Sequence, residues 1–490
     1  MIRWAPRQTF VDELEGMFEG WKADHVESPG LLVANADLAT ELGLDPEWLG
    51  TPDGVATLLG AAPLPHRTVA QAYAGHQFGS YSPRLGDGRA LLLGEALTAD
   101  DRRVDIHLKG SGRTTFSRGG DGKAAVGPMV REYIIGESLH ALGLPTTRAL
   151  AVVATNETIA RDRPLPGAVL VRVAASHLRV GSFQYAASTG DTALVRRLAD
   201  HAIARHHPQC AADPQPYLAL IEAVSAAQAR LISQWMAIGF IHGVMNTDNM
   251  TISGESIDFG PCAFMEAHDP RAVFSSIDHG GRYAYGQQPG IAQWNLARFA
   301  ETLLPLLHDD VQEAIRLATE AVEHFADLFR LEYVARMRAK LGLVDPHMSG
   351  DDAVSIVNSL LSSMTSHKID HTLAFRSLSG VVRGERRAFD ALFPDTDDVR
   401  QWTQRWLAAV PADLSIRQGI ADGMDAVNPV HVPRNHLVEE ALAAATAGDL
   451  APLHELVGIL RSPFERLPGD ERHLRPAPEG WEGYMTFCGT

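Results

Sequence analysis

The chain has 490 residues, of which 45% are hydrophobic and 21% are charged, so it has ample material for a folded core. Its 43 basic and 60 acidic side chains give a formal charge of −17, which argues against a protein that binds nucleic acid through a broad basic face. No apolar run approaches the roughly 18 residues of a membrane span, the N-terminus lacks the apolar core of a secretory signal, and three cysteines cannot build a disulfide framework. We therefore expect a bacterial, cytoplasmic, monomeric protein with no membrane or nucleic-acid partner.

The order of predicted elements changes along the chain. The first 65 residues mix short helical segments with proline and glycine turns, and the next region predicts strands at 90–93, 104–108, 149–154 and 168–173. One helix interrupts these strands, from Pro128 to Leu142, with proline in its first turn and Gly143 as its stop. From residue 192 a helical period dominates, over 217–238, 291–345, 352–393, 398–420 and 434–463. A β-rich region with one helix, followed by a helical region, predicts an α+β fold with two lobes.

A glycine-rich turn precedes the first of these strands, in the segment RLGDGRALLLGEAL (84–97). Gly86 and Gly88 would let the backbone approach a ligand and point N–H groups at phosphate oxygens. Because the same turn is common in ordinary hairpins, it does not identify a nucleotide site by itself.

Lys109 is the last residue of the alternating strand that begins at Val104, and the chain has only five lysines. Strand alternation puts it on the face opposite the apolar residues Val104, Ile106 and Leu108. A strand lysine beyond a glycine turn suits an ammonium held against nucleotide phosphates, and Glu132 on the following helix is its candidate partner. Such a lysine–glutamate pair is typical of protein kinases. The alternatives are a surface lysine on an edge strand and a solvated glutamate.

The segment FIHGVMNTDNMTISGESIDFGPCAFM (240–265) contains Asp248, Asn249 and an Asp-Phe-Gly sequence that begins at Asp258. Kinases hold Mg²⁺ with a catalytic-loop asparagine and the aspartate of this turn, whose oxygens suit a hard cation. In kinase order with the glycine turn and the lysine–glutamate pair, the combination is specific. A kinase loop also has an aspartate base five residues before its asparagine, where this chain has Val244. The chain is therefore either inactive or receives its acceptor hydroxyl from another direction.

Together these segments resemble the selenoprotein O (YdiU) family, kinase-fold proteins that act as protein adenylyltransferases. The resemblance covers about residues 70–310 and rests on YAGHQFGSYSPRLGDGRA (73–90), HLKGSGRTTFSRGGDGKAA (107–125), HGVMNTDNM (242–250), IDFGPCAF (257–264) and GRYAYGQQPGIAQWNLARFAETLLPL (281–306). It implies metal-dependent transfer of AMP from ATP to Ser, Thr or Tyr hydroxyls of proteins, with release of pyrophosphate. The nucleotide is then inverted relative to kinases, so that its α-phosphate faces the acceptor, and the metal is Mg²⁺ or Mn²⁺.

The resemblance also implies a role for each matching residue. Asp248 is the proton acceptor, and Glu132 supports Lys109. Asn249 and Asp258 are the metal ligands. The nucleotide contacts are Gly86, Gly88, Arg89, Lys109, Asp121, Gly122, Arg172, Arg179 and Asp258. We expect Arg172 and Arg179 to reach inward from one strand, VLVRVAASHLRVG (169–181), toward the terminal phosphates, with ordinary surface arginines as the alternative.

The resemblance further divides the chain into four parts. We expect an N-terminal extension at 1–70, a kinase-like N-lobe with the nucleotide-binding elements at 71–190, a helical C-lobe with the metal-binding loop at 191–470, and a C-terminal tail at 471–490. Family tails carry cysteine or selenocysteine near their end, so we expect a redox-sensitive contact between Cys488 and Cys262. A buried Cys262 and an idle thiol at 488 are the alternative.

Three other functions stay open. They are UMP transfer from UTP with manganese, ordinary γ-phosphoryl transfer, and a nucleotide-binding pseudokinase scaffold without activity. The missing aspartate argues against γ-phosphoryl transfer, and the two intact metal ligands argue against a scaffold.

Overall fold

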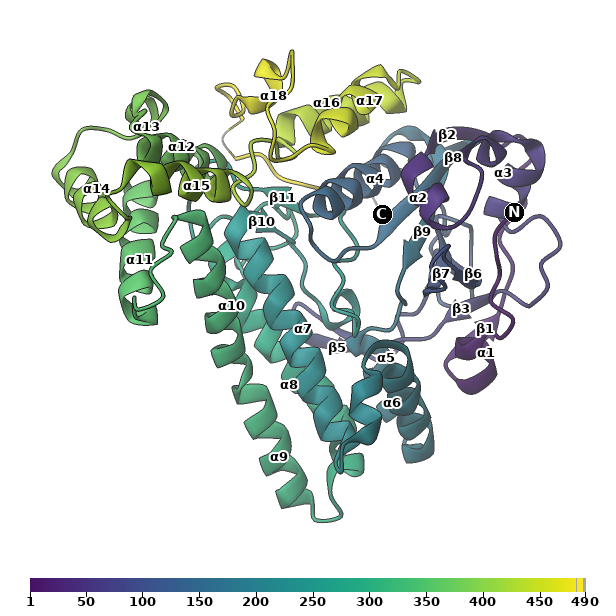
Figure 1. Ribbon diagram of the computed structural model, residues 1–490. Helices are drawn as coiled ribbons and strands as arrows, with labels where there is room; N and C mark the ends of the chain where they lie inside the picture. Colours follow the sequence, from purple (N-terminus) through teal and green to yellow (C-terminus); the bar gives the residue numbers. More distant parts are fainter. Residues whose placement is uncertain (482, 488–490) are drawn as a thin grey trace.

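The computed structural model describes residues 1–481 and 483–487, and it has the mixed α+β architecture that the sequence predicts (Figure 1). A seven-stranded antiparallel sheet has the order β1-β3-β6-β7-β9-β8-β2. Its strands are β1 (Phe18–Gly20), β2 (Gly30–Ala34), β3 (Val69–Gln71), β6 (Ala90–Leu97), β7 (Arg103–Lys109), β8 (Arg148–Ala160) and β9 (Pro164–Ala174). The four strands predicted from apolar runs are confirmed as β6 to β9.

Both faces of the sheet are covered. On one face lies α4 (Val126–Ala141), the predicted helix, which ends just before Gly143 in the left-handed conformation (φ +78°). This helix is buried almost all round, because α16 (Asn435–Thr446) and α17 (Ala451–Leu460) pack on its outer side (Figure 1). The other face packs against α2 (Ala36–Glu41) and α3 (Pro52–Leu58).

The strand alternation expected around Lys109 is confirmed. Val104, Ile106 and Leu108 belong to the core on the α2 and α3 side of the sheet. Lys109 therefore points to the α4 side, and so does Arg172, because its neighbour Leu170 packs with α4 while Val171 belongs to the other core. Two cationic side chains thus face one helix.

The first 65 residues contain the expected short helices, α1 (Thr9–Glu13), α2 and α3, but also two strands that the sequence did not predict. These strands, β1 and β2, form the two outer edges of the sheet and have three and five residues. Their partners are remote in sequence, since Phe18 pairs with Gln71 and Gly30 with Ala154. Strands so short carry little periodicity of their own.

The rest of the chain is largely helical, as predicted, and turns divide the long predicted ranges into separate helices. The longest, α7 (Pro216–Ile238), starts with proline and ends at Gly239 with φ +73°. The helices around it are α5 (Val180–Ser188), α6 (Thr192–His206), α8 (Gln288–Leu307), α9 (Val311–Glu323) and α10 (Phe325–Lys340). A second helical core joins the end of α10 to α11 (Gly350–Ser366), α12 (His371–Arg383), α13 (Arg387–Leu392), α14 (Asp397–Ala409) and α15 (Leu414–Asp425).

Short elements connect the two parts of the molecule. The chain between β3 and β6 forms a hairpin of β4 (Gly75–Gln77) and β5 (Ser80–Ser82). Further along, β10 (Phe240–Ile241) pairs with β11 (Ala263–Phe264). Between β10 and β11 lie the one-turn helix η3 (Thr247–Asn249) and the Asp-Phe-Gly sequence. The last helix, α18 (Glu471–Leu474), precedes the tail. Across the residues that the structure describes, no helix is long and apolar enough to span a membrane.

Candidate active site

A cavity of about 500 Å³ lies where the sheet, α4 and the β10–β11 connection meet. Every residue predicted to bind nucleotide or metal, to accept the proton or to support the lysine lines it: Gly86, Gly88, Arg89, Lys109, Asp121, Gly122, Glu132, Arg172, Arg179, Asp248, Asn249 and Asp258. Residues far apart in the sequence therefore converge on a volume that suits a nucleotide-sized ligand.

Two carboxylates and three cations form a single cluster in this cavity. Lys109 Nζ donates to Glu132 Oε1 at 2.7 Å and to Asp258 Oδ1 at 2.5 Å, so the expected lysine–glutamate pair is present. Arg172 Nη2 joins the same two carboxylates, at 3.0 Å from Glu132 Oε2 and 2.8 Å from Asp258 Oδ1. Arg179 Nη1 lies 3.4 Å from Asp258 Oδ2. The cations outnumber the carboxylates by one.

The cluster keeps its carboxylates ionised although they are buried. Burial alone would raise the pKa of Asp258, but Lys109, Arg172 and Arg179 hold that pKa well below its usual range. Burial likewise opposes ionisation of Glu132, and Lys109 and Arg172 lower its pKa. The backbone of Asp258 has φ +63°, a left-handed conformation that a non-glycine residue adopts only where its surroundings hold it.

Arg179 does not share a strand with Arg172, so this expectation is wrong. Strand β9 ends at Ala174, and Arg179 is the residue that precedes α5. The chain leaves the sheet after β9 because it pairs with another segment, with Ile252 N donating to Leu178 O at 2.9 Å. The guanidinium still reaches the cavity, where it lies 4.6 Å from the centre of the Tyr73 ring and donates to Asp248 O at 2.9 Å.

Asp248 is buried in η3, and burial raises its pKa to about 6, although Arg179 acts in the opposite direction. Its Oδ2 accepts a hydrogen bond from Gln77 Nε2 at 3.3 Å, and its Oδ1 has no hydrogen-bond partner among the described residues. Asn249 Nδ2 donates to Val244 O at 3.0 Å, which leaves the amide oxygen as the end able to bind a ligand. Val244, at the position of the kinase aspartate, is a buried apolar residue.

Packing against Phe116 also requires a glycine in the turn at 86–88. Gly86 has φ +65°, and a Cβ atom there would lie 2.3 Å from Phe116 Cγ. Between the two glycines, Asp87 turns inward, accepts a hydrogen bond from Gln71 N at 3.0 Å and lies 3.0 Å from His107 Nε2. The turn is thus anchored to the sheet from within.

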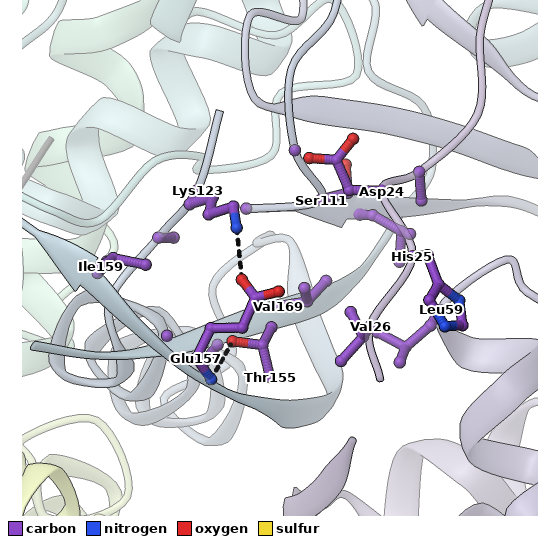
Figure 2. Close-up of a pocket in the computed structure, with 17 residues that line it drawn as sticks. Asp24, His25, Val26, Leu59, Ser111, Lys123, Thr155, Glu157, Ile159 and Val169 are labelled. Atoms are coloured by element: carbon purple, nitrogen blue, oxygen red, sulfur yellow. Dashed lines mark hydrogen bonds and ion pairs between the residues drawn. The ribbon is translucent and has the colours of Figure 1, made fainter. Parts of the chain in front are cut away.

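The other glycine-rich segment, around Gly122, is held by ion pairs. Asp121 accepts two hydrogen bonds from Arg161, at 2.7 and 3.1 Å, and Lys123 Nζ lies 2.5 Å from Glu157 Oε2. Figure 2 shows the Lys123–Glu157 pair at a second, small pocket beside this segment, which Asp24 from the N-terminal region also lines. That pocket has about 20 Å³, room for about one water molecule, so it offers no second ligand site.

The chain matches the family model described as protein adenylyltransferase SelO over residues 6–461. It belongs to the SelO family. A protein nucleotidyltransferase YdiU from Mycolicibacterium smegmatis is 57% identical over 486 residues, which cover 98% of this chain and 97% of the relative. Proteins with the same description from Chromobacterium violaceum and Cereibacter sphaeroides are 54% and 53% identical, over 97% and 98% of this chain and 100% and 98% of their own lengths.

Membership of the SelO family confirms the predicted activity class. The chain is a protein nucleotidyltransferase that carries out AMPylation, and its substrates are therefore a nucleotide and other proteins. The family also implies a kinase-like fold for the mixed α+β structure. The relatives named above are bacterial.

The cavity also has lining residues that sequence reasoning missed, and four of them contact the predicted residues or the sheet: Tyr73, Gln77, Asp87 and Arg161. Asp87 had a usable signal, because it stands between the two glycines of the turn. The others had none, since their contacts with Arg179, Asp248 and Asp121 each join segments that only the fold brings together.

The C-terminal tail reaches the segment after Asp-Phe-Gly. Thr486 Oγ1 donates to Pro261 O at 2.7 Å, and Thr486 N donates to Phe274 O at 2.7 Å. Cys262 is fully buried beside this contact, and its Sγ donates to Phe259 O at 3.1 Å. Cys488, the other cysteine of the expected redox pair, lies outside the described residues.

Proposed function

We propose that the chain transfers AMP from ATP to Ser, Thr or Tyr hydroxyls of proteins, with pyrophosphate as the leaving group, in the cavity around Asp258. The observation that carries this proposal is the cluster of three cations around Asp258 and Glu132, in the same cavity as Asp248. Its excess positive charge suits a polyphosphate. The absence of a kinase-type aspartate at Val244 supports transfer of a group other than the γ-phosphoryl.

Each side chain has a role that follows from its contacts. Lys109, Arg172 and Arg179 hold phosphate oxygens and stabilise the charge that develops on pyrophosphate as it leaves. Glu132 orients two of these cations through its hydrogen bonds at 2.7 and 3.0 Å. Asp248, which lines the same cavity, accepts the proton of the acceptor hydroxyl. The remaining nucleotide contacts come from two glycine-rich segments, at Gly86, Gly88 and Arg89 and at Asp121 and Gly122.

The donor set suits a divalent metal ion. Asn249 offers an amide oxygen and Asp258 a carboxylate held in its ionised form, and such oxygens fit Mg²⁺ or Mn²⁺. In the part of the chain that the structure describes, no group of three or more His, Cys, Asp or Glu side chains could hold a metal. Bound there, the ion would neutralise phosphate charge, and Asn249 and Asp258 would hold it together with oxygens of the nucleotide.

In this proposal the nucleotide is inverted relative to kinases, so that its α-phosphate lies next to Asp248. The sheet region at 71–190 then corresponds to a kinase N-lobe and the helices at 191–470 to a C-lobe, with extensions at 1–70 and 471–490. The position of Asp248 immediately before Asn249 supports this orientation, because it ties the proton acceptor to the metal-binding loop.

The deciding experiment compares label transfer to protein from α-³²P-ATP and γ-³²P-ATP, with Mg²⁺ or with Mn²⁺, and includes labelled UTP. We expect label from the α position only, and none with Asp258→Ala. Label from the γ position would make the chain a kinase and overturn the inverted nucleotide. Stronger transfer from UTP would make it a uridylyltransferase.

We also propose that Cys262 and Cys488 form a reversible, redox-sensitive contact that restrains the segment after Asp258. The hydrogen bond between Thr486 and Pro261 supports this, because Thr486 is two residues from Cys488 and Pro261 is next to Cys262. Two residues of chain span at most about 7 Å, so Cys488 cannot lie far from the contact that Thr486 makes beside Cys262. Mass spectrometry after mild oxidation should find a reducible cross-link between the two peptides, absent in Cys488→Ser. Oxidised protein without this cross-link would refute the contact.

A further inference from the structure

This inference rests on the proposed function and concerns the proteins that are modified. An acceptor hydroxyl that gives its proton to Asp248 must lie within hydrogen-bond distance of that carboxylate. Gln77, at the end of β4, donates a hydrogen bond to the Asp248 carboxylate. The next residue of the hairpin, Phe78, contacts the loop that precedes Asp248, because Phe78 N donates to Asn246 Oδ1 at 3.0 Å. The residues around an acceptor hydroxyl therefore lie against the β4–β5 hairpin.

The surface beside this hairpin carries a group of exposed or half-buried apolar side chains with one arginine among them. We call this group the acceptor rim, and its residues are Phe78, Tyr81, Ile277, Arg282 and Trp294. Phe78 and Ile277 line the cavity itself. Tyr81 and Ile277 are 44% and 49% exposed. Exposed apolar side chains gathered at the mouth of an active site are typical of a protein-binding surface.

The rim is held together by ring contacts. The His76 ring lies 5.0 Å from the Tyr81 ring and 5.2 Å from the Trp294 ring, so one side chain links the hairpin to α8. Phe78 packs against Tyr283 at 5.0 Å, and Tyr283 Oη donates to Asn246 Oδ1 at 2.6 Å. The rim is therefore a fixed surface with a direct connection to the loop that carries Asp248.

Arg282 gives this surface its charge. Its Cζ lies 4.8 Å from the Trp294 ring centre and 5.8 Å from that of Tyr283, and its Nε is buried without a hydrogen-bond partner. Throughout the described residues, no carboxylate forms an ion pair with it. The nearby Asp278 carboxylate instead accepts two backbone hydrogen bonds, from Arg282 N at 2.9 Å and from Tyr283 N at 2.7 Å.

A second arginine on the same tryptophan provides a contrast. Arg298 Cζ lies 5.2 Å from the Trp294 ring centre, but its guanidinium pairs with Glu301 Oε1 at 2.5 Å. Of these two stacked guanidiniums, Arg282 is the one whose charge is available to a ligand. Stacking fixes a guanidinium in one orientation, so that little entropy is lost when it pairs with a carboxylate.

We propose that Arg282 selects acceptor proteins that carry an Asp or Glu side chain close to the modified hydroxyl, while the aromatic rim holds that segment. The chain as a whole carries −17 charges and repels acidic partners, so recognition of an acidic segment needs a local cation at the site. Arg282 is thus a specificity-determining residue on the acceptor side of the cavity.

The test measures AMP transfer from α-³²P-ATP to serine peptides in which Glu, Gln or Lys occupies each neighbouring position in turn. Wild type should prefer the best Glu peptide over its Lys counterpart by about tenfold in kcat/KM, and Arg282→Glu should reverse this order. Arg298→Gln, the matched control on the same tryptophan, should keep the wild-type preference. Arg282→Lys should keep the sign of the preference but weaken it.

Two further measurements separate this inference from the proposed function. Affinity for ATP, measured by isothermal titration, should be equal in wild type and Arg282→Glu, which shows an intact nucleotide site. If AMP transfer proceeds and Arg282→Glu keeps the wild-type preference, the inference is overturned and the proposed function stands. If the wild type labels no peptide and no protein from α-³²P-ATP, the proposed function fails, and the inference fails with it.

Discussion

Two of the five lysines are buried, and they lie in opposite surroundings. Lys109, in the cavity, is 8% exposed and contacts the carboxylates of Glu132 and Asp258. Lys340, at the end of α10 in the second helical core, is 3% exposed and lies 4.3 Å from the Phe375 ring centre. No carboxylate pairs with Lys340 in the described ranges, and burial lowers its pKa to about 7. A buried cation keeps its charge only where partners surround it.

The comparison extends to the regions around the two lysines. The cavity draws charged side chains from β7, β9, α4, the start of α5 and the β10–β11 connection, and each contacts another. The core shared by α10 to α15 is built from apolar side chains such as Leu360, Phe375 and Trp406. Buried charged side chains that contact one another are therefore gathered at the junction of sheet and helices, while the helices α10 to α15 pack through apolar side chains.

The largest effect should come from removing the carboxylate that three cations share. Asp258→Ala should lower AMP transfer by about a thousandfold or more, because it removes a proposed metal ligand and leaves Lys109, Arg172 and Arg179 to repel one another. Initial rates of label transfer from α-³²P-ATP measure this. Asp351→Ala, at an exposed aspartate of α11, is the control. Transfer within tenfold of wild type would show that the cluster is structural.

Glu132 should act through its two cationic partners. Glu132→Gln should lower kcat/KM for ATP by about ten- to a hundredfold, because Lys109 and Arg172 lose the group that orients them. The double variant Glu132→Gln/Lys109→Met should be little worse than Lys109→Met alone, since neighbours in one network are not additive. Independent, additive losses in this cycle would contradict the proposed support.

The sequence predicted every residue of the charged cluster in the cavity but fewer of the connections between those residues. Lys109, Glu132 and Asp258 stand in motifs, because phosphate and metal chemistry restricts both residue type and order. The prediction that Arg179 lies on the same strand as Arg172 was wrong, because nothing in the local sequence shows where β9 ends. The end of β9 depends on the backbone hydrogen bond between Leu178 and Ile252, which are remote in sequence. The edge strands β1 and β2 were missed for the same reason. Long-range pairing leaves no periodic pattern in so short a segment.

A substitution at Gln77 should separate the nucleotide side of the cavity from the acceptor side. Gln77 makes the one hydrogen bond to the Asp248 carboxylate within the described residues. Gln77→Leu should lower kcat by about tenfold and leave KM for ATP unchanged, because it disturbs Asp248, the proposed proton acceptor, and not the cation cluster. Steady-state kinetics with varied ATP separate the two parameters, with Gln418→Leu on the surface of α15 as control. A rise in KM with kcat unchanged would place Gln77 on the nucleotide side.

The smallest effect concerns stability and comes from Lys340. Since its pKa falls from 10.5 to about 7 on folding, the folded state holds fewer protons than the unfolded state between those values, and wild type gains stability as pH rises through them. Below about pH 7 the penalty for the buried charge is complete. Lys340→Met should therefore raise the free energy of unfolding by about 1–3 kcal/mol near pH 6, and the gain should vanish toward pH 10.

Urea unfolding at several pH values measures this difference, with the exposed Lys22→Met as the matched control. The neighbouring His371 does not titrate in this range, because burial lowers its pKa well below the usual value, and burial lowers the pKa of His268 to about 4. The pH dependence of the difference therefore reports on Lys340 alone. A gain that is equal at all pH values would mean that folding does not shift the pKa of Lys340, because its ammonium finds a partner or water in the folded state. The contrast with Lys109 would then come from packing and not from charge.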